Sequence, residues 1–341
     1  MRLGERKRKI LRAVIDDYIM TGEPVGSRTI AKRYNLGISS ATIRNEMADL
    51  EEMGYLEQPY TSAGRIPSDL GYRLYVDELM DRYEISSDFL KFEFDFDSMS
   101  LEEIVKDMTK LLSKVTSYTS AAITPQLKKY ILKGIYLLPV DKKMILLLVV
   151  TSTGINRECV INLNRELDQG LLEKVANIIN EKFAEKEIEN FAFDIMDKIL
   201  VELKAYDYEN ELRHIVSILH KNLKALYNKE IFLCGTNNIL NFPEYNDINR
   251  AKLFFSVLED KEALLDVLEP DTTATIKITI GRENKYEELK ECSVLKATYS
   301  VDDKVLGSIG FIGPKRMEYS KLIAILNKIC EDLNDLLSKY I

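Results

Sequence analysis

One predicted helix, over residues 39–53, carries polar side chains of the kinds that bind DNA bases. At ~100° per residue, its apolar side chains fall within about forty degrees of one inward direction. These are Ile43, Met47 and Leu50. Arg44 and Asn45 point elsewhere, where an arginine can contact guanine or a phosphate and an asparagine can pair with adenine. The helix therefore has the chemistry of a recognition helix in the major groove.

Small and hydroxyl side chains at the start of this helix suit close approach to a nucleic acid. Ala41 is small enough to lie against a base or a thymine methyl group. The hydroxyl-bearing residues are Ser39, Ser40 and Thr42. Hydroxyls and free N–H groups at a helix N-terminus favour a phosphate. An ordinary solvated face is the alternative for this helix taken alone, and its neighbours argue against that alternative.

A second group of residues with the same potential lies at 58–67. Its centre is small and polar, and one long cation follows. The candidate DNA contacts here are Thr61, Ser62, Gly64 and Arg65. A flexible tip of this kind can lie over the DNA backbone and insert Arg65 toward a minor groove. A plain hairpin turn is the structural alternative.

The elements around these residues follow the order of a winged helix-turn-helix. Apolar spacing predicts a helix over 5–20, and Ser27 can cap a second short helix before the predicted recognition helix. A short strand at 55–57, a wing and a returning strand complete the order. Arg28 on the second helix is a candidate phosphate contact, although many surface helices carry such cations.

The charge distribution agrees with DNA contacts confined to one end. The whole chain has a net charge of -8. Residues 1–75 nevertheless hold twelve Lys or Arg against ten Asp or Glu, with five cations gathered between Arg6 and Arg12. A mildly basic N-terminal end on an otherwise acidic chain predicts that any nucleic acid binds at that end.

The remainder of the chain predicts an α+β fold class with several domains. Six strands are expected, at 130–138, 144–151, 156–162, 275–280, 293–300 and 305–311. Mainly helical residues interrupt them. The predicted domains are a winged helix-turn-helix over 1–84, a linker over 85–100, an α+β domain made of 101–164 and 271–341, and an insertion over 165–270. The last helix carries leucines and isoleucines at 4-3-4-3 spacing, a seam for a partner or for internal packing.

Several classes of protein fit the sequence poorly. Four scattered cysteines and two histidines form no zinc-ligand pattern, so no metal or cofactor is predicted. The apolar run 144–150 is too short to cross a bilayer, and charges interrupt the only signal-like segment, so a soluble cytoplasmic protein is expected. No GxGxxG or Walker loop is present, which argues against an enzyme. The glycines of 307–313 could cradle a phosphate, but room for close packing in a strand is the better interpretation.

Four strings of residues resemble one known family. They are SATIRNEM at 40–47, TSAGRIP at 61–67, GYR at 71–73 and GFIGPKRMEY at 310–319. The chain resembles the heat-inducible transcription repressor HrcA family. That resemblance implies a homodimer bound to an inverted-repeat operator, called CIRCE, ahead of chaperone genes. It also implies a GAF-like α+β domain, an inserted dimerisation domain, and a GroEL-type chaperonin that keeps the repressor active.

Two other functions remain open at this stage. A small-molecule-gated winged-helix regulator would bind an effector in a pocket over the sheet, although the predicted strands offer few polar groups to orient a ligand. A winged helix that binds protein instead of DNA is the other alternative. Neither composition nor spacing indicates how heat would relieve repression.

Overall fold

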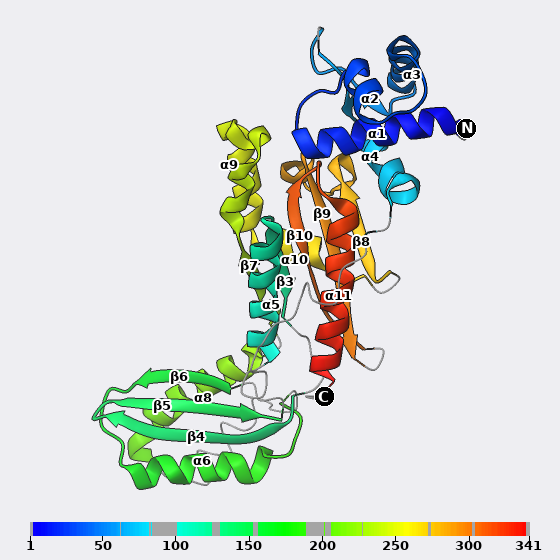
Figure 1. The fold of residues 1–341 in the computed structure, drawn as a ribbon. Coiled ribbons are helices and arrows are strands. Elements are labelled where there is room, and N and C mark those ends of the chain that lie inside the picture. Colours follow the sequence, from blue (N-terminus) through cyan, green and yellow to red (C-terminus); the bar gives the residue numbers. More distant parts are fainter. Residues whose placement is uncertain are drawn as a thin grey trace. The chain divides into compact units, whose positions relative to one another are not determined.

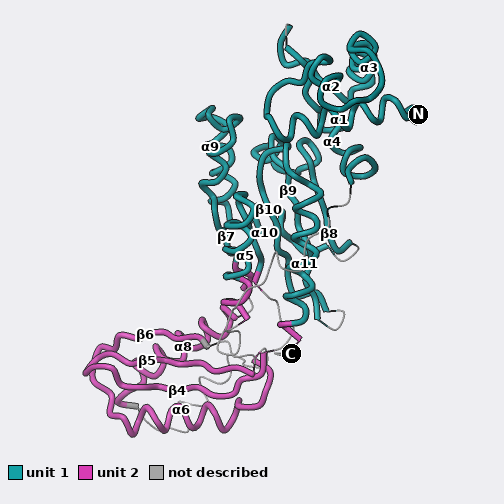
Figure 2. The backbone as a smooth tube through the Cα atoms, viewed as in Figure 1, with its two compact units in different colours: residues 1–94, 106–123, 231–335 teal, residues 95–105, 124–230, 336–341 magenta. Residues whose placement is uncertain are grey.

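A computed structural model describes most of the chain, and the chain divides into two compact units (Figure 2). The described residues are 3–61, 63–81, 83, 101–124, 130–152, 156–188, 201, 206–226, 228–271, 274–301 and 304–338. The first unit comprises 1–94, 106–123 and 231–335, and the second comprises 95–105, 124–230 and 336–341. Within the described residues, no helix is both long and apolar enough to cross a membrane.

The N-terminal elements are those of a winged helix-turn-helix (Figure 1). They are α1 (Glu5–Thr21), α2 (Ser27–Arg33), α3 (Ser40–Glu52), β1 (Leu56–Glu57), β2 (Ile66–Pro67), α4 (Asp69–Leu74) and the π-helical turn η1 (Tyr75–Leu79). The two short strands pair antiparallel, with Leu56 opposite Pro67. We call residues 3–83 the winged-helix part.

The helices of the winged-helix part enclose a small apolar core. Ile43 and Leu50 of α3 are fully buried and Met47 is nearly so, which confirms the inward direction predicted for this helix. Ile10, Leu11, Val14 and Ile15 of α1 and Ile30 of α2 are buried as well. Each such side chain contributes roughly 1.5–3 kcal/mol to stability by leaving water. The core thus holds α3 with its polar side turned outward.

A five-stranded antiparallel sheet forms the centre of the first unit's remaining residues, 106–123 and 231–335, which we call the α+β body. Its strand order is β7-β3-β10-β9-β8. The bounds are β7 (Ile231–Cys234), β3 (Thr119–Ile123), β10 (Lys304–Pro314), β9 (Cys292–Val301) and β8 (Ile276–Ile280). Strand β10 lies at the centre, with Gly310 opposite Ala121 on one side and Lys296 on the other.

Helices cover both faces of this sheet (Figure 1). They are α5 (Leu101–Thr116), α9 (Ile248–Glu259), α10 (Lys261–Leu268) and α11 (Tyr319–Leu337), with short turns η5 (Thr236–Asn241), η6 (Pro243–Asn246), η7 (Gly281–Glu283) and η8 (Glu287–Leu289). Because side chains alternate along β9, Val294 lies on the face of the sheet that packs against α9 and α10 in a shared apolar core. The same alternation turns Ser293 toward α11, where its hydroxyl lies 2.7 Å from that of Tyr319.

The seam predicted on the last helix serves internal packing. Leu322, Leu326, Ile329 and Leu333 of α11 are 1% exposed or less within the single chain. Figure 1 shows α11 lying along the sheet of the α+β body. No second copy is needed to bury these side chains, so α11 is not a free face for a partner.

The second unit is a separate α+β structure. A three-stranded antiparallel sheet runs β4-β5-β6, with bounds β4 (Leu132–Asp141), β5 (Met144–Thr151) and β6 (Asn156–Asn162). The helices are α6 (Gln169–Phe183) and α8 (Glu209–Ala225), preceded by the turn η4 (Tyr206–Tyr208). One face of the sheet and both helices share an apolar core that includes Leu147, Val149, Leu172 and Leu219.

The expected six-stranded sheet is wrong. The strands expected at 130–138, 144–151 and 156–162 exist, but they form the second unit and do not join β8, β9 and β10. The inserted segment accordingly spans 124–230 and not 165–270. The α+β body instead uses β3 and β7, which are short and pair with each other across a sequence separation of about a hundred residues. Local apolar patterning predicts that a strand exists, but it does not select the strand's partner. The predicted linker, 85–100, lies outside the described residues.

Gly310 occupies a position in β10 where no other residue fits. A Cβ atom built there would collide with the backbone carbonyl of Leu295 on β9. We expect Gly310→Ala to lower the stability of the first unit by about 3 kcal/mol, which is at the upper end for an overpacked core, and to lower its melting temperature by roughly 6–12 °C. Calorimetry measures both. Gly4→Ala is the control, because its Cβ would meet no atom within 4 Å; equal melting temperatures for the two variants would contradict this account.

Candidate nucleic-acid interface

The exposed face of α3 carries the side chains predicted to read bases. Ala41, Arg44 and Asn45 are all exposed, while Ile43 lies in the core on the opposite side. The helix has 13 residues, so this face extends for more than three turns. The structure therefore brings these three predicted residues together on one accessible surface.

The hydroxyl groups at the start of α3 are organised by a helix cap. The Ser39 hydroxyl accepts a hydrogen bond from the backbone N–H of Thr42 at 3.1 Å. The hydroxyls of Ser39 and Thr42 also lie 3.0 Å apart. Ser40 is partly exposed next to them. The cap stabilises the helix by about 1 kcal/mol, so Ser39 orients the reading face in addition to its predicted contact with phosphate.

Three cations on the helix-turn-helix have no internal charge partner. Among the described Lys and Arg residues of the winged-helix part, Arg28, Lys32 and Arg44 form no ion pair or side-chain hydrogen bond. All three are exposed, and they lie on α2 and α3. Arg33, by contrast, pairs with the buried carboxylate of Asp17 at 2.5 Å. The free positive charge of this part is therefore concentrated on its two central helices.

The basic run between residues 6 and 12, expected to supply DNA contacts, is used inside the molecule. Lys7 lies 2.5 Å from Asp49 and 2.6 Å from Glu46 of α3. These hydrogen bonds, that of Asp49 first, raise the pKa of Lys7. Arg8 pairs with Glu78, and Arg12 pairs with Asp81. The run thus ties α1 to α3 and to the segment that follows α4, and it leaves α2 and α3 as the basic surface.

The wing is a short hairpin closed by a side chain that the sequence did not single out. The amide of Gln58 donates to the carbonyl oxygens of Thr61 at 3.1 Å and of Ala63 at 3.2 Å. Thr61 is exposed at the tip, and so is Tyr60, with 63% of its surface accessible. No signal in the sequence indicated this role of Gln58, because a glutamine near a turn is common in proteins.

Gly64 and Arg65 hold the wing against the turn between α1 and α2. The backbone of Arg65 pairs with that of Val25, with hydrogen bonds of 2.8 and 2.9 Å. A Cβ on Gly64 would collide with the Val25 carbonyl, so only glycine permits this approach. The Arg65 guanidinium lies 2.7 Å from Glu51 of α3. Arg65 is therefore not a free cation at the wing tip, and its contact with DNA stays a prediction. Ser62, the remaining predicted contact, lies outside the described residues.

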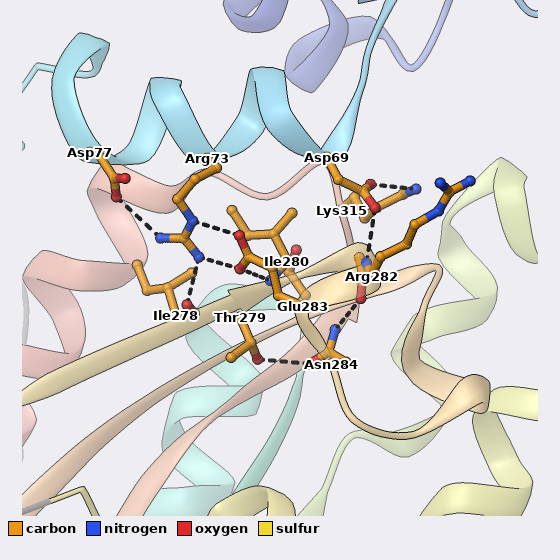
Figure 3. Close-up of polar contacts among 12 residues, drawn as sticks. Asp69, Arg73, Asp77, Ile278, Thr279, Ile280, Arg282, Glu283, Asn284 and Lys315 are labelled. Carbon is orange, nitrogen blue, oxygen red and sulfur yellow. Dashed lines mark hydrogen bonds and ion pairs between the residues drawn. The ribbon is translucent and has the colours of Figure 1, made fainter. Parts of the chain in front are cut away.

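Polar contacts join the winged-helix part to the α+β body within the first unit (Figure 3). Arg73 of α4 binds the carboxylate of Glu283 through two nitrogen atoms, one at 2.8 Å, and donates to the carbonyl of Ile278 at 2.7 Å. Asp69 accepts from the backbone N–H of Arg282 and from Lys315, both at 2.9 Å. These contacts set the direction in which α3 faces relative to the α+β body.

The Arg73–Glu283 pair provides a test of this junction. The hydrogen bond to Glu283 raises the pKa of Arg73, but both side chains are partly solvated, with 28% and 36% of their surfaces exposed. We therefore expect a coupling free energy of only about 1 kcal/mol in a double-mutant cycle of Arg73→Gln and Glu283→Gln, measured by urea unfolding and reduced by added salt. Additive effects of the two changes would show that the pair does not stabilise the junction.

No cluster of His, Cys, Asp and Glu suited to a metal ion occurs in the described part of the chain. All four cysteines are free thiols. Burial raises the pKa of Cys292 to about 12, so this thiol stays protonated at neutral pH. A winged helix-turn-helix joined to an α+β body is an architecture typical of multidomain DNA-binding proteins.

Comparison with known proteins identifies the family. Residues 102–323 match the family model described as "HrcA protein C terminal domain". The heat-inducible transcription repressor HrcA of Thermoanaerobacter pseudethanolicus is 46% identical over 342 residues, covering 99% of this chain and 98% of that protein. The same repressor from Caldanaerobacter subterraneus is 44% identical over 347 residues, with 99% and 98% coverage. The chain belongs to the HrcA family of heat-inducible transcription repressors.

A solved structure shares the fold. The crystal structure of a hypothetical protein at 2.2 Å resolution superposes with a TM-score of 0.73 at 22% identity, and the match covers 100% of both chains. The α+β body corresponds to the part of the chain for which the family resemblance implies a GAF-like domain, and residues 124–230 of the second unit interrupt it in sequence. The fold class predicted from the sequence is confirmed, with the change of sheet membership described above.

Proposed function

We propose that the protein represses chaperone operons by binding double-stranded DNA at an inverted-repeat operator of the CIRCE type. The observation that carries this proposal is the placement of free positive charge on α2 and α3, beside the exposed Ala41 and Asn45. Phosphate contacts supply most of the affinity for DNA, and side chains that reach base edges supply sequence preference. The proposed contacts are Arg28, Lys32, Ser39, Ser40, Ala41, Thr42, Arg44, Asn45, Thr61, Ser62, Gly64 and Arg65.

Recognition of an inverted repeat calls for two copies of the chain, and we propose that the second unit provides the dimer contact. The face of its sheet turned away from α6 and α8 is apolar yet accessible. Leu138 of β4 is 48% exposed and Val160 of β6 is 53% exposed. Leu146 of β5 is opposite both. Tyr136 and Val140 extend the patch. An apolar patch of this kind marks a protein contact, and a two-fold dimer would bury it against itself.

Three further parts of the proposal concern localisation, catalysis and a chaperonin partner, and they are suggested by the family resemblance. We propose a cytoplasmic, non-enzymatic regulator that uses no cofactor and whose active form is maintained by a GroEL-type chaperonin. Chaperonin dependence agrees with the exposed apolar face on the second unit, because a monomer would present that face to any binder of apolar surface.

The test is binding of the purified chain to an inverted-repeat CIRCE duplex and to a scrambled duplex across a salt series, by fluorescence anisotropy. We expect a preference for the inverted repeat of ~10³-fold or more. The log–log salt slope should be about −0.9 per phosphate contact, hence roughly −4 if Arg28 and Lys32 of each protomer contact phosphates. Equal affinity for both duplexes in a folded, dimeric sample would refute sequence-specific binding.

A further inference from the structure

A cavity of about 550 Å³ lies within the first unit, where the winged-helix part meets the α+β body. Tyr18, Asp69 and Tyr72 line it from the winged-helix part. The lining residues from the α+β body include Arg250, Arg282, Lys315 and Arg316. A volume of this size is within the range of small-molecule sites. A molecule bound there would touch both parts at once.

One buried hydroxyl in the cavity wall makes no hydrogen bond. Tyr72 is 1% exposed, and its hydroxyl has no partner among the described residues. Burial raises the pKa of this phenol well above 10, so it stays protonated and can donate. The groups whose charges influence it include Tyr18, Glu244 and Arg316, which line the same cavity. An unpaired buried hydroxyl destabilises the folded protein, and an acceptor bound in the cavity would remove that cost.

Some charged side chains that line the cavity form ion pairs with each other, and others form none that the structure describes. Arg316 is bound to the carboxylate of Glu244, and Lys315 lies 2.9 Å from Asp69 and 3.4 Å from Glu291. The side chains of Arg250 and Arg282 form no ion pair within the described residues. In Figure 3 no dashed line reaches the Arg282 guanidinium, whereas the Arg282 backbone N–H donates to Asp69. Two guanidinium groups are therefore available at the cavity, against one exposed carboxylate, Glu57, without an ion pair in the described chain.

We propose that this junction cavity binds a small organic anion with at least two negative charges, a phosphate ester or a polycarboxylate. Arg250 and Arg282 would bind its charged oxygens, since guanidinium groups suit the geometry of both chemistries. The Tyr72 hydroxyl would donate to an oxygen at the inner end. These residues are not among the DNA contacts proposed on α2, α3 and the wing.

Occupancy of the cavity would couple to the orientation of the winged-helix part. Asp69, Lys315 and the Arg282 backbone make contacts that cross the junction and also border the cavity. An anion that bridges Tyr72 to Arg250 and Arg282 adds further contacts across the same boundary. By linkage, a ligand that favours one orientation changes operator affinity by the same factor by which operator DNA changes ligand affinity. This consequence, unlike the binding site itself, rests on the proposed DNA-binding function.

The site can be tested on the full chain without DNA. Isothermal titration calorimetry and thermal shift would use pyrophosphate and citrate as probes, with NaCl at matched ionic strength as reference. We expect saturable binding of at least one probe and a melting temperature that rises with its concentration. Citrate alone would indicate a polycarboxylate ligand, and pyrophosphate alone a phosphate ester. Both probes giving no more than the NaCl response would overturn the proposal.

Substitutions inside and outside the cavity test whether the probe binds there. Tyr72→Phe keeps the ring and removes the unpaired hydroxyl, so the free protein should be as stable as wild type or more stable, while probe affinity falls about tenfold. Arg250→Gln/Arg282→Gln should lower probe affinity by tenfold or more. Lys304→Gln, an exposed cation outside the cavity, and Lys32→Gln, on the DNA surface, are the controls. Loss of binding in Lys32→Gln with full binding in the cavity variants would place the anion on α2 and refute the proposed site.

Discussion

Replacing Arg44 with alanine is expected to lower affinity for the inverted-repeat duplex by about 10- to 100-fold and to relax base preference at one position of each half-site. A side chain that contacts a base with two hydrogen bonds contributes roughly 1–3 kcal/mol of discrimination, and 1.4 kcal/mol corresponds to a factor of ten. Arg44 is exposed and has no described charge partner, so its removal breaks no described ion pair or side-chain hydrogen bond. Unfolding of the variant should therefore match that of wild type.

Lys32 provides the matched control for Arg44. It is also exposed and without a described ion pair, but it lies on α2, where contact with the DNA backbone is expected. Lys32→Ala should weaken binding to the inverted repeat and to the scrambled duplex alike, and it should reduce the salt slope by about one per protomer. Anisotropy titrations of both variants on both duplexes separate the two effects. An Arg44→Ala variant that loses the same factor on every duplex would assign Arg44 to the backbone instead of a base.

Leu138→Glu/Val160→Glu is expected to dissociate the dimer and, with it, to lower affinity for the inverted repeat by ~10²–10⁴, because two linked half-sites become two separate binding events. The two side chains face each other across Leu146 in one row of the β4-β5-β6 sheet. Both are already about half exposed. Charge at these positions therefore costs little in the folded monomer, whereas four carboxylates brought together in a dimer interface are strongly unfavourable.

Light scattering measures the mass of this variant, and circular dichroism confirms that it is folded. Ile248→Glu/Leu253→Glu on α9 is the matched control, since those side chains are 68% and 48% exposed on the other unit. We expect this control to remain dimeric. If the α9 variant dissociates and the sheet variant does not, the dimer contact lies on the α+β body and the assignment to the second unit is wrong.

The winged helix-turn-helix could be predicted from local sequence because its determinants are local. The apolar spacing of Ile43, Met47 and Leu50 sets which side of α3 is buried, and Ser39 marks the helix start. Both signals act over one or two turns, within reach of pattern analysis. The outward positions of Ala41, Arg44 and Asn45 follow directly from the inward ones. The candidate reading surface was for this reason predicted residue by residue.

Charge pairing could not be predicted in the same way. Five cations between Arg6 and Arg12 suggest a DNA-binding surface, but Lys7 is held by carboxylates some forty residues away on α3. Arg65 is a second example, because its positive charge is paired with the carboxylate of Glu51 on α3. A cation's availability depends on which acidic side chains the fold places beside it. Only the structure separates Arg28, Lys32 and Arg44 from the other basic residues.

By itself, the sequence determined the existence and type of most helices and strands, the inward face of α3 and the family, because each rests on a repeating pattern or a continuous string of residues. The tertiary structure decided which strands share a sheet. Nothing in the local composition of β4, β5 and β6 marks them as strands of a separate sheet, yet they pair with one another, while β3 and β7 complete the sheet of the α+β body. Backbone hydrogen bonds are alike for every strand. The choice of partner therefore came from long-range packing, which also created the junction cavity around Tyr72.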